Sequence, residues 1–414
     1  MTKFKDYHRN IKVRIAHIFF SDIIAGAIMP FLAIYFANHY GAKVAGLLLL
    51  MNVCIGMFVG LYGGYYADLV GRKKLMVIAA VIRTIAFVVM AAANSPWMTS
   101  PELTYVMTIL IGASFGLDGP AAEAMLIDIT KPKERKGVFS LIYWSFNLAF
   151  TLGSIGGALM FQHYLFELLI FITVSTLIAT LLIVFFIEET LKVKEAPKQK
   201  HVLKHMYTSY KEVASDKVFI SFVLAGMLLQ SLELHLENYI AVRLYAEMPE
   251  QSFFHFTFSG VEMLGFLKAE NTIIVVLLTL YITRWITKYH EGRTLLSSIV
   301  VYTIGYSVVS YSNNIWVLFI FMFFATVGEL MRVPIQQEYL ASIPTEDKRS
   351  AYLAVNGMLF YGAMMISSMF ITLGSFLSNE MMSAFIFGSG MVAFIILFRL
   401  IPDLELRKKS ASQK

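Results

Sequence analysis

The sequence predicts an all-α integral membrane protein in which twelve transmembrane helices form two six-helix bundles. Three observations lead to this prediction. Hydrophobic residues make up 57% of the 414 residues and charged residues only 15%, whereas an average soluble domain carries about 25% charged residues. Apolar runs long enough to cross a bilayer, which takes roughly 20 residues, recur along the whole chain. Lys and Arg gather in every second loop between these runs, which is typical of a protein that crosses a membrane many times.

The apolar runs set the positions of the predicted helices. These helices cover residues 14–38, 44–66, 75–94, 103–126, 138–162, 165–187, 217–244, 271–290, 294–312, 315–337, 348–375 and 380–401. Lys and Arg are frequent in one set of alternate loops, which includes both chain ends, whereas the opposite loops hold only Lys43, Arg243 and Lys268. Because positively charged loops stay on the inner side of the membrane, both termini are predicted to be cytoplasmic.

The N-terminal segment favours a retained first span over a cleaved signal peptide. Residues 1–12 are polar and basic, and the apolar run of residues 15–38 is longer than the roughly 7 to 15 residues of a signal sequence. We therefore expect a multi-pass protein of a bacterial plasma membrane. The single cysteine, Cys54, lies within an apolar run, so neither a disulfide framework nor a thiol metal site is expected.

The chain is predicted to divide into an N-terminal six-helix bundle (1–187), a cytoplasmic linker with an amphipathic helix (188–216), a C-terminal six-helix bundle (217–401) and a cytoplasmic tail (402–414). The linker is too polar to insert into the bilayer, but apolar side chains recur within it at helical spacing. The two bundles are predicted to be repeats, because the charged segment 128–135 ahead of Asn147 has a counterpart in residues 341–349 ahead of Asn356.

A charged hairpin joins the second and third predicted spans. Residues 64–74 read GYYADLVGRKK, so an acid at the end of one helix is followed by a glycine and three cations. This pattern resembles the G-x-x-x-D-x-x-G-R-K loop signature of the major facilitator superfamily, which lies at the same place in that family. The resemblance implies that Asp68 and Arg72 form a conformational latch between the two spans.

Ionisable side chains inside the predicted spans are the main candidates for function. A charge at the bilayer centre costs about 2.5 to 3.5 kcal/mol on insertion scales, so such residues usually face a wet cavity or a partner. The acids are Asp22, Asp118, Glu123, Asp128, Glu233, Glu237 and Glu329, and the clearly basic residues at similar depth are Arg83 and Arg332. An excess of buried acids is suited to the exchange of protons for a cationic substrate.

The predicted substrate-binding residues are chosen from these acids by their positions. Glu233 and Glu237 are four residues apart and share one helix face, with Asn238 beside them. Glu329 lies in the middle of a span, where it either functions directly or forms an ion pair with Arg332. The substrate-binding candidates are Glu237, Asn238, Glu329, Asp118, Asp22 and Glu233. Asp22 either contacts substrate or caps a kink above Pro30.

The resemblance extends over nearly the whole chain, to the proton-driven multidrug antiporters of the superfamily. It is carried by Asp68 with Arg72, by Asp128 ahead of a basic loop, by Tyr143-Trp144 with Asn147, by Glu237-Asn238, and by Gly328-Glu329 ahead of Pro334. It implies that Asp68, Arg72, Asp128, Glu237 and Glu329 couple proton movement to conformational change. The chain departs from the pattern at Ile142, where these antiporters carry an acid, and at residues 153–157, where the antiporter signature lacks its proline.

The function predicted from these residues is proton-coupled export of lipophilic, cationic drugs by alternating access, driven by the proton gradient without a cofactor or a bound metal. Expected partners are lipophilic small molecules, protons and membrane lipids, but not nucleic acid, and the protein is expected to be a monomer. The alternatives are a lipid or glycolipid translocase, favoured by the apolar external loop predicted at residues 245–270, and a proton-coupled nutrient symporter. No nucleotide loop, metal cluster or nucleophile arrangement of an enzyme is present in the sequence.

Overall fold

The computed structural model describes residues 7–130, 132–190, 211, 213–253, 256–343 and 349–412. These residues are almost entirely helical, which confirms the predicted fold class. The chain divides into two compact units, Met1–Ala196 and Pro197–Lys414. Most of the predicted linker, including the residues of its amphipathic helix up to Tyr210, lies outside the described residues.

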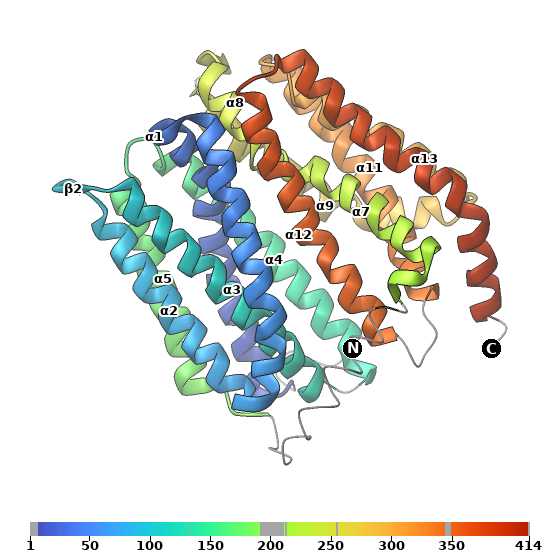
Figure 1. Cartoon of the computed structure of the whole chain (residues 1–414), viewed down its shortest axis with the longest axis horizontal. Helices are drawn as coiled ribbons and strands as arrows, with labels where there is room; N and C mark the ends of the chain where they lie inside the picture. Colours follow the sequence, from blue (N-terminus) through green and yellow to red (C-terminus); the bar gives the residue numbers. More distant parts are fainter. Residues whose placement is uncertain are drawn as a thin grey trace. The chain divides into compact units, whose positions relative to one another are not determined.

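Unit 1 is a bundle of five assigned helices and one short hairpin (Figure 1). They are α1 (Arg9–Val70), α2 (Arg72–Ala92), β1 (Asn94–Ser95), β2 (Met98–Thr99), α3 (Pro101–Ile129), α4 (Pro132–Met160) and α5 (Leu165–Phe186). The strands β1 and β2 pair antiparallel, with Asn94 opposite Thr99. Helix α1 packs against α3, α4 and α5, and α2 packs against α3 and α5.

Helix α1 contains the first two predicted spans. Gly41 interrupts its helical geometry with φ 76° and ψ 156°, a backbone region that favours glycine because a Cβ atom would be strained there. The loop predicted between residues 38 and 44 is therefore reduced to a break at a single glycine.

Close backbone contact joins α1 to α4 through glycines of both helices. A Cβ atom on Gly153 would lie 2.1 Å from the carbonyl oxygen of Ile23, and one on Gly26 would lie 2.2 Å from that of Phe150. Any larger residue at these positions would push the helices apart. The glycines of the 153–157 segment thus have a packing role in this bundle.

Unit 2 contains seven described helices and a second hairpin (Figure 1). They are α7 (Lys217–Leu234), α8 (Tyr239–Glu247), β3 (Gln251–Phe253), β4 (Phe256–Phe258), α9 (Gly260–Ile286), α10 (Glu291–Val309), α11 (Ile315–Ser342), α12 (Arg349–Gly374) and α13 (Asn379–Ser412). Helix α7 packs against α12 and α13, α10 against α11 and α13, and α9 against α8 and α11.

The predicted external loop at residues 245–270 is too long, since α8 ends at Glu247 and α9 begins at Gly260. The segment forms the end of α8, the antiparallel hairpin of β3 and β4, and the first eleven residues of α9, which begins at Gly260. A capping box starts α9: the hydroxyl of Ser259 accepts from the helix backbone, and Glu262 accepts from the Ser259 amide at 2.9 Å. Lys268, Glu270 and Asn271 lower the local hydropathy, so the hydropathy pattern placed the helix start too late. As a result, Lys268 lies within α9 rather than in a loop.

Arg243 is also predicted from its charge to lie in an external loop, whereas in the structure it lies in a helix. It lies in α8 and is only 2% exposed. Its guanidinium donates to the carbonyl oxygens of Val309 at 3.2 Å and Ser312 at 2.8 Å, near the end of α10. Arg243 therefore satisfies helix-end carbonyls that would otherwise be unpaired.

The described helices account for the predicted spans. Nine helices of the described residues are long and apolar enough to cross a membrane, with α7 and α8 counted together. That set counts α1 once, although α1 contains two predicted spans divided at Gly41, and it does not include α4 and α9. When α1 is counted as two spans and α4 and α9 are added, each predicted span has a helical counterpart. The cytoplasmic placement of both termini stays a prediction.

Candidate functional site

Each unit holds a cluster of charged side chains within its helices. The cluster in unit 2 is called here the acid cluster, and it consists of Glu233, Glu237, Lys268, Asn271, Glu329 and Arg332. It brings together three acids predicted from sequence, which come from α7, from the segment after α7 and from α11. It also includes two residues of α9 that the sequence analysis did not select.

A break in the seventh span positions Glu237 and Asn238. Helix α7 ends at Leu234 and α8 begins at Tyr239. Asn238 has φ −115° and ψ −96°, and its side-chain amide donates to the Leu234 carbonyl oxygen at 2.9 Å and to Oγ of Ser367 in α12 at 3.1 Å. These bonds fix the break against α12. The predicted substrate contact of Asn238 stays a prediction, because both of these bonds are structural.

Lys268 is the partner of Glu237. The ammonium group of Lys268 donates to Oε1 of Glu237, and the two side chains are 11% and 25% exposed. The pair connects α9 to the break after α7. Sequence reasoning missed Lys268, although the S-x-x-E signature of a capping box at Ser259 and Glu262 marks the start of the helix that carries it.

Glu233 lies in the last turn of α7, four residues before Glu237 in the break. Its Oε2 accepts from Nε2 of Gln230 at 2.9 Å. The charges of Arg332, Lys268 and Glu237 all act on it. The i, i+4 relation predicted from sequence thus does bring Glu233 and Glu237 into one electrostatic environment.

Glu329 and Arg332 have separate partners. Oε2 of Glu329 accepts from the Asn271 amide at 3.1 Å, and the same amide donates to Oγ1 of Thr326 at 3.1 Å. Nη1 of Arg332 donates to Oε1 of Gln336 at 2.5 Å. The structure therefore does not show the ion pair between Glu329 and Arg332 that their spacing allowed.

The cluster in unit 1 is centred on Asp118. Nη2 of Arg83 lies 3.2 Å from Oδ2 of Asp118, and the two side chains are 4% and 9% exposed. Nε of Arg83 also donates to Ser114 at 3.0 Å, and its guanidinium lies 4.0 Å from the ring centroid of Phe115. A buried acid with a buried guanidinium on it is already neutralised, so Asp118 holds α2 and α3 together.

Two further polar residues of α1 accompany this cluster and were missed from sequence. Arg14 and His17 are 5% and 3% exposed, and Nη1 of Arg14 lies 3.0 Å from Nδ1 of His17. Asp22 interacts electrostatically with Arg14 and Arg83. Both residues lie within the first predicted span, residues 14–38, one helical turn apart, but neither is among the candidates selected from sequence.

The predicted latch is described in part. The side chains of Asp68 and Asp128 lie outside the described residues. Nη1 of Arg72 donates to the Ala124 carbonyl oxygen in α3 at 2.7 Å. The amides of Arg72 and Lys73, at the start of α2, donate to the Glu189 carboxylate at 3.2 and 3.0 Å. Arg72 therefore connects α2 to α3, and Glu189 stabilises the positive end of the α2 dipole.

No metal centre is found among the side chains that the structure describes, since no group of three or more His, Cys, Asp or Glu residues could hold a metal ion. The acid cluster can instead exchange ligands. Its carboxylates accept a proton, the Lys268 ammonium or another cation, and these compete because each neutralises the same negative charge.

Comparison with known proteins gives consistent results. The family model described as Major Facilitator Superfamily matches residues 16–267. A Na(+), Li(+), K(+)/H(+) antiporter of Planococcus maritimus is 35% identical over 400 residues, covering 90% of this chain and 94% of that protein. Multidrug resistance protein MdtH of Blochmanniella floridana is 24% identical over 337 residues, covering 80% and 78%.

Solved structures of low sequence identity share the fold. A peptide transporter POT in complex with alafosfalin superposes with a TM-score of 0.76 at 15% identity, over 97% of this chain and 96% of that chain. A D-xylose-proton symporter superposes with a TM-score of 0.70 at 13% identity, over 95% and 97%. At such identities the likeness concerns the fold alone.

Proposed function

Because this chain belongs to the Major Facilitator Superfamily and is a multi-pass transporter of the plasma membrane rather than an enzyme, we propose that it is a proton-coupled antiporter that exports a cation. The observation that carries this proposal is the ion pair of Lys268 with Glu237 beside Glu233, inside the helices of unit 2. Ionisable groups at that depth are expensive and are usually kept for transport.

The acid cluster supplies a simple exchange. Ionised Glu237 holds the Lys268 ammonium, and an arriving cation displaces that ammonium from the carboxylate. A proton that binds Glu237 or Glu329 removes the negative charge and releases the cation. Proton and cation thus bind the same groups in turn, which is the condition for antiport. The proton gradient supplies the energy, and no cofactor is required.

The first candidate cargo is a small monovalent cation such as Na+, Li+ or K+. A relative that covers 90% of this chain at 35% identity is named for these ions. Hard cations prefer oxygen ligands, and the amide nitrogen of Asn271 donates to both Glu329 and Thr326, which brings a carboxylate and a hydroxyl oxygen to the same amide.

The second candidate cargo is a lipophilic, cationic drug. The sequence pattern around Asp68, Asp128, Glu237 and Glu329 resembles that of the lactococcal multidrug transporter LmrP, and the MdtH relatives are named for multidrug resistance. The same carboxylates serve either cargo, since both are attracted by negative charge. The lipid translocase stays an alternative, although residues 260–270 of the segment that favoured it belong to α9.

Transport in proteoliposomes tests the proposal. Vesicles with an imposed pH gradient receive Na+, Li+, K+ or a lipophilic cation dye, and a pH-sensitive fluorophore reports proton movement. We expect each true cargo to collapse the gradient with wild-type protein and with Glu250→Gln, which changes an exposed acid. Glu237→Gln is expected to be inactive. A gradient that survives every cation with wild-type protein would refute antiport.

A further inference from the structure

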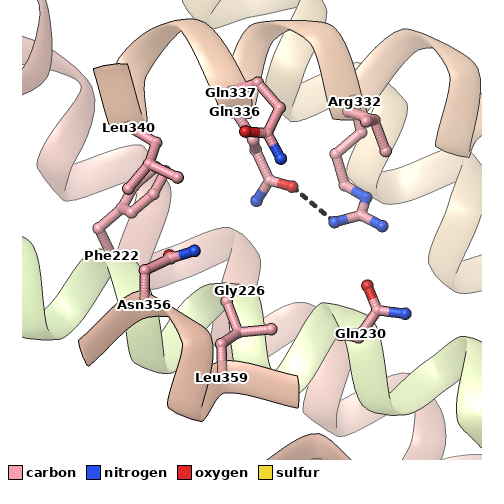
Figure 2. Close-up of a pocket in the computed structure, with 10 residues that line it drawn as sticks. Phe222, Gly226, Gln230, Arg332, Gln336, Gln337, Leu340, Asn356 and Leu359 are labelled. Carbon is pink, nitrogen blue, oxygen red and sulfur yellow. Dashed lines mark hydrogen bonds between the residues drawn. The ribbon is translucent and has the colours of Figure 1, made fainter. Parts of the chain in front are cut away.

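Unit 2 holds a partly open cavity whose lining does not suit a cation. Helices α7, α11 and α12 surround a cavity of about 180 Å³. Figure 2 shows Arg332 and Gln336 of α11 with Gln230 of α7 and Asn356 of α12 around it. Gln337 of α11 also lines it. All the polar groups at this cavity are amides or a guanidinium, and none is an acid.

Arg332 is the charged group of this cavity. It is only 3% exposed, and its Nε has no hydrogen-bond partner. Nη1 donates to Gln336, and the guanidinium carbon lies 4.7 Å from the ring centroid of Tyr302. Within the described residues Arg332 forms no ion pair, although the charges of Glu233 and Glu329 act on it from nearby; these two acids accept hydrogen bonds from Gln230 and Asn271.

A buried charged donor without a hydrogen-bond partner, such as Nε of Arg332, is costly, and a small anion in the adjoining space would accept from it. Guanidinium groups bind carboxylates through two parallel N–H donors, and side-chain amides add further donors. A cation in this cavity would be repelled by Arg332. The chemistry of the lining therefore selects a single negative charge.

We propose that this cavity is a binding site for a small monovalent anion, chloride or a carboxylate, held on the guanidinium of Arg332 and on the amides of Gln337 and Asn356. The site shares Arg332 with the acid cluster, but no acid lines it. This inference goes beyond the proposed antiport, since the anion is bound whether or not a cation is exchanged.

Direct binding to the purified full-length chain tests this site. Radiolabelled chloride and radiolabelled acetate are titrated separately in detergent, and bound label is counted by scintillation proximity. We expect saturable binding of at least one of the two anions, and the arm that binds identifies the ligand as halide or carboxylate. Arg332→Gln is expected to weaken this binding by about tenfold or more.

Two further variants keep the test decisive. Arg293→Gln removes an exposed arginine of α10 and is expected to bind the anion as the wild type does. Asn356→Leu leaves Arg332 in place but removes one amide from the lining, so it is expected to weaken binding even where Arg332→Gln fails to fold. Absence of saturable binding of both anions overturns the proposal. Undiminished binding by folded Arg332→Gln, or by Asn356→Leu, overturns it as well.

Discussion

Lys268 of α9 forms an ion pair with Glu237, which lies in the break between α7 and α8. The pair joins two segments of unit 2 at the level of the acid cluster. It also holds the carboxylate of Glu237, which is the first of the substrate-binding candidates predicted from the sequence. A cation that binds Glu237 must therefore compete with an ammonium that the protein itself supplies.

The ion pair predicts a characteristic result for single and double variants. Glu237→Gln leaves the Lys268 ammonium buried and unpaired, so we expect thermal stability in detergent to fall by about 1–3 kcal/mol. The double variant Glu237→Gln with Lys268→Gln removes both charges and should regain most of that stability. Transport should stay absent in both. Equal stability of the single and double variants would contradict a coupled pair.

Glu329 offers a test of proton coupling without loss of fold. In Glu329→Gln the new side-chain oxygen still accepts from Asn271, so insertion and thermal stability should change little. Proton-driven extrusion of cations should fall to the level of empty vesicles, because the side chain no longer takes up a proton. Glu167→Gln, at an exposed acid of α5, is the matched control. Unchanged extrusion by Glu329→Gln would show that this carboxylate is not used.

The pair of Arg83 with Asp118 predicts a large effect on stability. Both side chains are almost fully buried, so Asp118→Asn leaves an uncompensated guanidinium and should cost about 3–5 kcal/mol, measured by chemical or thermal unfolding. The double variant Arg83→Met with Asp118→Leu should be close to the wild type in stability. If that folded double variant still transports, the pair is purely structural.

Hydrogen bonds that join the start of α7 to α12 and α13 predict that the stability of the protein depends on pH. Asp216, just before the span that starts at Lys217, accepts from Arg407 at 2.7 and 3.0 Å and from the Tyr352 hydroxyl at 2.9 Å. Burial alone would raise the pKa of Asp216, but these bonds and one from the Phe219 amide together hold that pKa below its usual value.

A carboxyl whose pKa is lowered on folding stabilises the protein above its unfolded pKa, about 3.9, and this stabilisation is lost as the pH falls through the folded pKa. Asp216→Asn should therefore be less stable than the wild type at neutral pH, while the difference shrinks below about pH 4. Thermal unfolding of both proteins at several pH values measures this difference in stability. A difference that does not change with pH would exclude titration of Asp216 as its source.

The latch predicted at Asp68 and Arg72 is expected to affect the rate of transport but not the binding of the cargo. Arg72 connects the start of α2 to the Ala124 carbonyl of α3, and Asp68 belongs to the last turns of α1. Asp68→Asn should slow proton-driven transport while equilibrium binding of the cation stays nearly unchanged, because the latch does not contact cargo. A loss of binding as large as the loss of transport would contradict this role.

The hydropathy pattern predicted the bounds of the helices well where polar residues were few. It predicted them wrongly where polar residues lay inside a helix. The spans at 165–187 and 315–337 agree closely with α5 and α11. The start of α9 was missed because Lys268, Glu270 and Asn271 lower the local hydropathy although the helix continues through them. The break after Leu234 was not predicted, since apolar residues continue on both sides of it.

The sequence by itself determined the membrane class, the spans, the resemblance to a transporter family and the acids that are candidates for transport, because insertion energies and helical periodicity depend on neighbouring residues. Only the tertiary structure decided which charges meet. Lys268 pairs with Glu237, Arg83 with Asp118 and Asn271 with Glu329, across 31, 35 and 58 positions of the chain. Such contacts follow from helix packing, and a buried charge is stabilised only by the partner that packing brings to it.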